Sequence, residues 1–135
     1  MNDDARELTK QWVAKAHSDW EAVEILSAHP RCPRDTVCFH CQQFVEKLLK
    51  AQLTLNGVEA PRTHNLRRLI QLAGPFTEGL SDHIDESDTL TAHGVASRYP
   101  DERHEIGADE MDQMVALARE FARILLPKLE TIDND

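Results

Sequence analysis

The sequence predicts an all-α fold, an up-and-down bundle of four longer helices with one additional short helix. Apolar side chains recur every three or four residues along most of the 135-residue chain, which is the period of an amphipathic helix. Alternating or β-branched runs typical of strands are missing, and aromatic residues make up only 5% of the chain. No stretch has the length or composition of a linker, so we expect residues 1–135 to form a single domain.

The first helix is expected from about residue 4 to about residue 28. His29-Pro30 and Cys32-Pro33 end it, because proline has no N–H to donate and disfavours helical backbone in the residue before it. One apolar stripe runs along this helix, formed by Ala5, Leu8, Trp12, Ala16, Val23 and Leu26.

The second helix has the widest apolar face, so we expect it to be the most buried helix of the bundle. Asp35 or Thr36 is expected to cap its start, and Asn56-Gly57 stops it after Leu55. The short third helix is expected after a cap at Thr63. It ends before Gly74-Pro75.

The fourth helix is expected from Ser81 to a stop near Arg98-Tyr99-Pro100, where proline again interrupts the pattern. The last helix begins near Asp109-Glu110, since acidic side chains are favourable at the positive end of the helix dipole. Pro127 lies inside the apolar pattern of this helix and is expected to kink it or end it near Leu126.

The charge is divided unevenly along the chain, whose formal net charge is −9. Residues 31–72 carry seven basic and three acidic side chains, whereas residues 73–113 carry two basic and eleven acidic ones. An acidic protein is a poor non-specific binder of nucleic acid, and we expect no binding to DNA. The basic middle segment either forms a local anion site or is a solvated helix face of mixed charge.

The three cysteines and the N-terminal sequence predict a cytoplasmic protein. An odd number of cysteines argues against a disulfide framework, and no apolar run is long enough to signal export or to span a membrane. Cys38 and Cys41 resemble half of a zinc site, but a second ligand pair is missing, so we interpret both as core residues. We therefore expect neither a metal nor a cofactor.

Polar side chains form a row along the second helix, spaced by three or four residues so that they share one side. The row is either a solvated face that includes a Glu46–Lys50 pair, or a polar seam that faces a cleft or a second subunit. It consists of His40, Gln43, Glu46 or Lys47, and Lys50.

Two further segments combine residues that bind anions. His64, beside the expected cap, either is incidental or binds an anion at the start of the third helix. Arg98 and His104 are six positions apart around a proline-fixed bend and could converge on one phosphodiester. The alternative is that Arg98 only ends the fourth helix and pairs with its acidic neighbours.

These pieces together resemble the HEPN domain, the helical nucleotide-binding domain of higher eukaryotes and prokaryotes. The resemblance spans about residues 5–127, and no phosphate-binding loop or zinc-protease motif competes with it. It is carried by Ala16-x-x-Asp19, by CFHCQQFVEKLLKA at residues 38–51, by Thr63-His64-Asn65-Leu66, and by Arg98-Tyr99-Pro100.

The resemblance implies a compact cytoplasmic bundle that is usually dimeric and often accompanies a nucleotidyltransferase or belongs to a toxin–antitoxin pair. The wide apolar face of the second helix also points to a homodimer, as do Trp12 and Trp20 of the first helix, since we do not expect one bundle to bury both. As a nucleotide- or RNA-phosphate-binding module, it would use His40, Lys47, His64, Arg98 and Tyr99 as ligands.

Two alternatives remain open. Some members of the family are metal-independent endoribonuclease toxins, and the family's Arg-to-His spacing is met here by Arg98 and His104. Tyr99 and Pro100 depart from the small polar residue that usually follows the arginine in that motif. The other alternative is a purely structural partner subunit of a nucleotidyltransferase.

Overall fold

The computed structural model describes residues 2–96 and 105–134, and these residues form helices and connections without any strand. The prediction of an all-α fold is therefore confirmed. The α-helices are α1 (Asp3–Ala28), α2 (Arg34–Leu55), α3 (Leu66–Ala73), α4 (Ile84–Ala96) and α5 (Ala108–Glu130). Short 3-10 turns cover Gly74–Phe76, Leu80–His83 and Thr131–Asn134.

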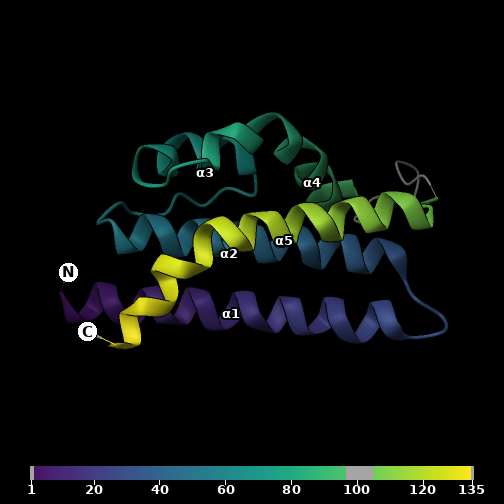
Figure 1. The fold of residues 1–135 in the computed structure, drawn as a ribbon, viewed down its shortest axis with the longest axis horizontal. Coiled ribbons are helices and arrows are strands. Elements are labelled where there is room, and N and C mark those ends of the chain that lie inside the picture. Colours follow the sequence, from purple (N-terminus) through teal and green to yellow (C-terminus); the bar gives the residue numbers. More distant parts are fainter. Residues whose placement is uncertain (1, 97–104, 135) are drawn as a thin grey trace.

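Helix α2 is the centre of the bundle (Figure 1). It packs against every other α-helix, with α1 on one side, α5 alongside, and α3 with α4 forming a layer on the side opposite α1. The two chain ends lie close together at one end of the molecule (Figure 1). A hydrogen bond from Arg6 Nη1 to the carbonyl oxygen of Ile132, 3.0 Å long, joins them.

The core is built around α2, as its wide apolar face predicts. The other helices contribute buried apolar side chains to the same core, namely Phe121 and Leu125 of α5, Leu90 of α4 and the apolar residues of α3. Trp20 of α1 stacks on Phe44 with ring centroids 4.9 Å apart. The fully buried apolar side chains of α2 are Val37, Cys38, Cys41, Val45, Leu48, Leu49, Ala51 and Leu53.

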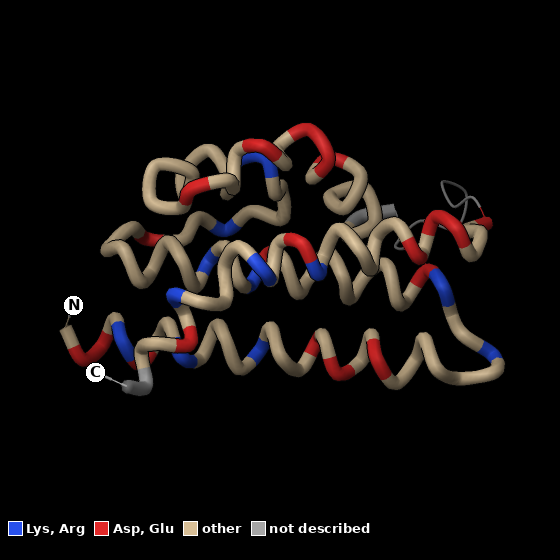
Figure 2. The backbone as a smooth tube through the Cα atoms, viewed as in Figure 1, with Lys and Arg blue, Asp and Glu red and all other residues tan. Residues whose placement is uncertain are grey.

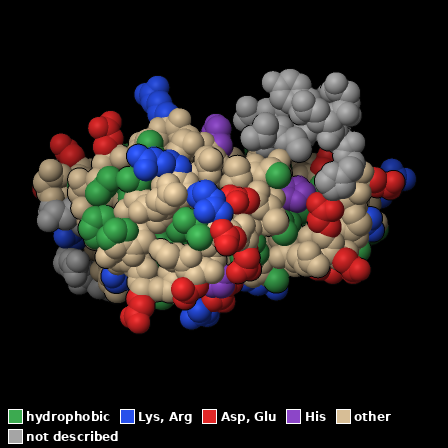
Figure 3. Space-filling view, turned by 90° about the horizontal axis from the view of Figure 1, so that it is seen from above, with side chains coloured by type: hydrophobic (Ala, Val, Ile, Leu, Met, Phe, Trp, Pro, Cys, Tyr) green, Lys and Arg blue, Asp and Glu red, His purple; other side chains and the backbone are tan. Residues whose placement is uncertain are grey.

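Acidic positions crowd the turn before α4, α4 itself and the start of α5 (Figure 2). On the face formed by α3 and α4, basic side chains lie among acidic ones (Figure 3). Arg67 there bonds both Asp85, at 2.6 Å, and Asp88, at 2.9 Å. The basic stretch and the acidic stretch of the sequence thus meet and partly neutralise each other at this surface.

Two predicted caps are wrong. Helix α2 begins at Arg34 after Pro33 and has no side-chain cap. Its first turn is closed by the backbone, where the amide of Val37 donates to the carbonyl of Pro33 at 3.0 Å. Helix α3 is capped by Asn65, whose Oδ1 accepts from the amide of Arg67. Asn65 is two residues closer than Thr63 to Leu66, the first buried leucine of α3, and asparagine is at least as good a cap as threonine.

The limits of the last two helices differ in part from expectation. Ser81 lies in the 3-10 turn that precedes α4, and the predicted stop at residues 98–100 lies outside the described residues. Helix α5 does not end near Leu126 but continues through Pro127 to Glu130, while its last turns bend toward α1 (Figure 1). Pro127 cannot donate to the carbonyl four residues before it, and a bend of the last turns is the usual consequence of a proline inside a helix.

Among the described residues, no helix is long and apolar enough to cross a membrane.

Cys38 and Cys41 are buried core residues, as predicted, and their burial sets their chemistry. Desolvation raises the pKa of each thiol to about 12, because burial disfavours the charged thiolate. Cys32, before α2, is only partly buried.

We therefore expect a thiol reagent such as Ellman's reagent at pH 8 to modify Cys32 in the native protein and to reach Cys38 and Cys41 only after unfolding. Mass spectrometry of the labelled peptides identifies the modified residue. Labelling of Cys38 or Cys41 at the rate of Cys32 under native conditions would contradict the packing of α2.

Candidate functional site

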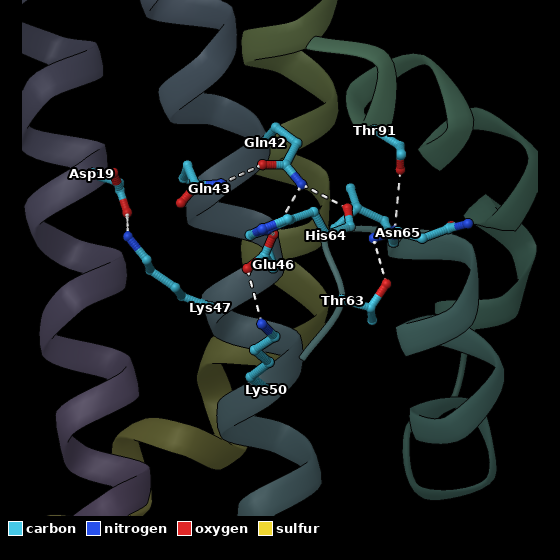
Figure 4. Close-up of polar contacts among 11 residues, drawn as sticks. Asp19, Gln42, Gln43, Glu46, Lys47, Lys50, Thr63, His64, Asn65 and Thr91 are labelled. Carbon is cyan, nitrogen blue, oxygen red and sulfur yellow. Dashed lines mark hydrogen bonds and ion pairs between the residues drawn. The ribbon is translucent and has the colours of Figure 1, made fainter. Parts of the chain in front are cut away.

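Five polar side chains follow one another along α2 where α1, α2 and the segment before α3 meet (Figure 4). Three of them are largely buried, which is unusual for charged and amide groups unless they are paired. We call this row the polar seam. Its members are Gln42, Gln43, Glu46, Lys47 and Lys50.

On the α1 side, the seam is held by Asp19, a carboxylate that is only 7% exposed. Its Oδ1 accepts a hydrogen bond from Nδ1 of His40 at 2.8 Å, and its Oδ2 accepts from the ammonium group of Lys47. In Figure 4 the side chains of Asp19 and Lys47 reach toward each other across the gap between the two helices. One carboxylate of α1 thus orients two of the predicted ligand residues.

On the α3 side, Glu46 is 3% exposed and is fully occupied by partners. Its Oε1 accepts from Nδ1 of His64 at 2.9 Å and from Nε2 of Gln42 at 3.2 Å, and its Oε2 accepts from Nζ of Lys50 at 3.0 Å. The ammonium of Lys50 also lies 5.5 Å from the ring centre of Trp12. This cluster connects α1, α2 and the segment before α3.

The segment that carries His64 is fastened to its surroundings by its own backbone. The carbonyl of His64 accepts from Nε2 of Gln42 at 3.0 Å, and Thr63 Oγ1 accepts from the amide of Asn65. The amide of Leu66 donates to Thr91 Oγ1 of α4. His64 is therefore held in place by contacts to both α2 and the first turn of α3.

The same geometry gives both histidines one defined outer nitrogen. A carboxylate that accepts from Nδ1 places the ring proton there, so Nε2 is the nitrogen that can meet a proton or a ligand. The side chain of His40 is 27% exposed and that of His64 is 52% exposed. Each histidine is thus an imidazole oriented by a carboxylate, His40 by Asp19 and His64 by Glu46. The same two carboxylates also pair with the lysines of the polar seam, Asp19 with Lys47 and Glu46 with Lys50.

The model of the HEPN domain family matches residues 9–129 of the chain. The chain belongs to the HEPN domain family. It is 32% identical over 98 residues to a protein from Methanocaldococcus jannaschii named "Putative toxin MJ1304", a match that covers 68% of this chain and 63% of that protein. The chain thus spans less than two thirds of the length of this relative. No solved structure matches the chain.

The predicted ligand residues that the structure describes lie on two sides of the polar seam. His40 and Lys47 meet at Asp19, and His64 lies at Glu46 on the other side of the seam. Arg98, Tyr99 and His104 lie outside the described residues.

The described residues on either side of that segment are fastened together. Nε2 of His93, in α4, lies 3.1 Å from Oε2 of Glu110, in the first turn of α5. Nη1 of Arg34, at the start of α2, donates to the carbonyl of Ile106 at 3.3 Å. Next to His93, Gly94 packs so closely on Gln42 that a Cβ there would lie 2.7 Å from the amide carbon. Both ends therefore lie beside α2.

Sequence reasoning missed the carboxylates that organise the site. Asp19 entered only through the resemblance, and Glu46 was interpreted as half of an i,i+4 pair on one side of the helix. The pair with Lys50 exists, but it is buried rather than solvated. A signal was available, because Glu46 lies between Val45 and Leu48 on the helix expected to be most buried.

We expect Glu46→Gln to destabilise the protein by about 3 kcal/mol, because it leaves the buried ammonium of Lys50 without its counter-charge. Urea unfolding followed by circular dichroism measures the change.

The matched control is Glu120→Gln, which breaks an exposed i,i+3 pair with Arg123 and should change stability little. Equal effects of the two substitutions would show that the seam does not depend on the charge of Glu46.

Proposed function

We propose that this HEPN protein is a toxin that binds RNA phosphate and cleaves RNA without a metal ion, using Arg98 and His104. The Arg-to-His spacing and the name of the similar archaeal protein support this function. The observation that carries it is the fastening of α4 to α5 through His93 and Glu110.

Chain length ties the two proposed catalytic residues to these fastened ends. Arg98 follows Ala96 by two residues and His104 directly precedes Glu105. In the sequence, both residues therefore adjoin the two ends that the His93–Glu110 contact holds together. Because α4 and α5 approach each other here, a guanidinium and an imidazole can serve one phosphodiester.

The proposed reaction is an attack by a ribose 2′-hydroxyl on the adjacent phosphorus. The new bond joins O2′ to phosphorus, and the bond from phosphorus to the 5′ oxygen of the next nucleotide breaks. His104 accepts the hydroxyl proton and returns a proton to the departing 5′ oxygen, while Arg98 stabilises the negative charge on the phosphoryl oxygens. The products are a 2′,3′-cyclic phosphate and a free 5′-hydroxyl.

We further propose that the protein acts as a cytoplasmic homodimer with an antitoxin as its partner. Three free cysteines fit a reducing compartment. Helix α1 packs mainly on α2, and Ile25 on its surface is exposed. Apolar side chains left in solvent on an outer helix favour association with another chain.

A second candidate function keeps the seam itself as the ligand site. A nucleotide phosphate would be met by Nε2 of His40 and of His64 and by Lys47, with Arg98 and Tyr99 completing the site. The outward Nε2 atoms favour this function, whereas Asp19 and Glu46 compete with a phosphate for the same cations. Such a module would be accessory to a nucleotidyltransferase, either as a binding subunit or as a structural partner that co-purifies with it.

We expect the purified protein to cleave a fluorescently labelled single-stranded RNA in the presence of EDTA and to leave 2′,3′-cyclic phosphate ends. Arg98→Ala and His104→Ala should each lower the rate by about 100-fold or more, because each removes a group that acts in the transition state. Gel electrophoresis with end-group analysis measures both.

Arg103→Ala is the matched control, since it removes an arginine from the same segment but from outside the motif. Expression of the wild type should also arrest growth, and the two motif variants should not. Intact RNA, together with thermal stabilisation by a nucleotide that is lost in Lys47→Ala, would overturn cleavage in favour of the binding module.

A further inference from the structure

A groove lies at the end of the bundle where α1 begins. It has a volume of about 520 Å³ and lies between the first turns of α1, the end of α2 and the connection that follows. Leu8, Trp12 and Val58 supply its apolar surface, and Asp4 and Glu59 supply its charged groups. Figure 1 shows this end of α1 opposite the end at which α4 meets the start of α5.

Two observations indicate that the groove is incomplete in the isolated chain. Leu8 is 46% exposed, although it is a large apolar side chain next to a concave surface. Among the described residues, the indole Nε1 of Trp12 is buried and has no hydrogen-bond partner. A buried donor without an acceptor costs about 1–3 kcal/mol, so the packing around this ring, which lines the groove, leaves a polar group unsatisfied.

The charge of the groove decides between possible occupants. Its lining includes two carboxylates and no lysine or arginine. A second copy seated on the same surface would bring Asp4 and Glu59 close to their own counterparts, which is unfavourable. A partner with basic side chains would neutralise them. The apolar surface and the volume fit one or two large apolar side chains.

We propose that this groove binds a partner protein through a short segment in which a large apolar side chain is flanked by lysine or arginine. The apolar side chain packs on Leu8, Trp12 and Val58, and the basic side chains lie against Asp4 and Glu59. This surface lies at the opposite end of the bundle from the contact between α4 and the start of α5, so its occupation does not depend on RNA cleavage.

Synthetic peptides test the proposal directly on the full chain. The probe is Ac-Lys-Leu-Phe-Leu-Arg-NH₂, compared with Ac-Glu-Leu-Phe-Leu-Asp-NH₂ and Ac-Lys-Ser-Ser-Ser-Arg-NH₂. We expect the first peptide alone to shift the Trp12 indole N–H resonance in a proton–nitrogen correlation spectrum, with saturation at submillimolar to millimolar concentration. A Trp20→Phe variant assigns the resonance, because only these two tryptophans are present.

Leu8→Ser should weaken binding about tenfold or more, because it removes the apolar contact. Ile25→Ser is the matched control: it replaces the other exposed large apolar side chain of α1, outside the groove, and should leave affinity unchanged. Glu59→Lys should weaken the basic peptide and strengthen the acidic one.

Three results would overturn the proposal. These are no shift of the Trp12 resonance at millimolar basic peptide, equal binding of the basic and acidic peptides, and equal loss of affinity in Leu8→Ser and Ile25→Ser. A dimer in sedimentation that Leu8→Ser dissociates and Ile25→Ser does not would instead assign the groove to a second copy of the chain.

Discussion

A carboxylate buried in the middle of α2 constrains the arrangement of the elements around it. Glu46 is 3% exposed, and an ionised carboxylate so far from water must be surrounded by donors. Lys50 comes from the next turn of the same helix, but His64 comes from the connection to α3. The connection between α2 and α3 therefore has to cross α2 beside Glu46. Helix α3 begins directly after this crossing, with Asn65 as its cap and Leu66 as its first residue.

The same requirement operates on the other side of α2. Asp19 is the only acidic residue of α1 that is buried, and His40 and Lys47 pair with it. Apolar stripes alone allow two helices to slide by a turn at little cost, whereas a buried carboxylate must meet its partners at one register. Asp19 and Glu46 thus specify how α1, α2 and the segment before α3 fit together. They also hold the imidazoles of His40 and His64 through Nδ1.

The sequence predicted the helices well because their signals are local. Apolar periodicity and prolines located α1, α2 and α3 within a few residues, and the burial of α2 followed from its wide apolar face. The errors concern groups that compete for one position. Thr63 and Asn65 can both cap a helix, and only the position of Leu66 in the core decides for Asn65.

The site was less predictable, since spacing shows which residues share a face but not what covers that face. The row on α2 was compatible with solvent, with a cleft or with a second subunit. The deciding contacts are long-range, from Lys47 to Asp19 across 28 positions and from Glu46 to His64 across 18. No helical period relates such residues, so only the packed fold identifies Asp19 and Glu46 as the organising groups.

Lys50 connects the polar seam with the groove at the N-terminal end. Its ammonium donates a hydrogen bond to Glu46 and lies over the ring of Trp12. A segment that binds in the groove therefore packs against the same ring that faces this ammonium. Because Lys50 is buried, breaking its ion pair with Glu46 would cost free energy that hydration does not return. The Lys50 side chain therefore resists a large displacement. The polar seam therefore fixes one wall of the groove, which makes the groove a preformed surface for a partner.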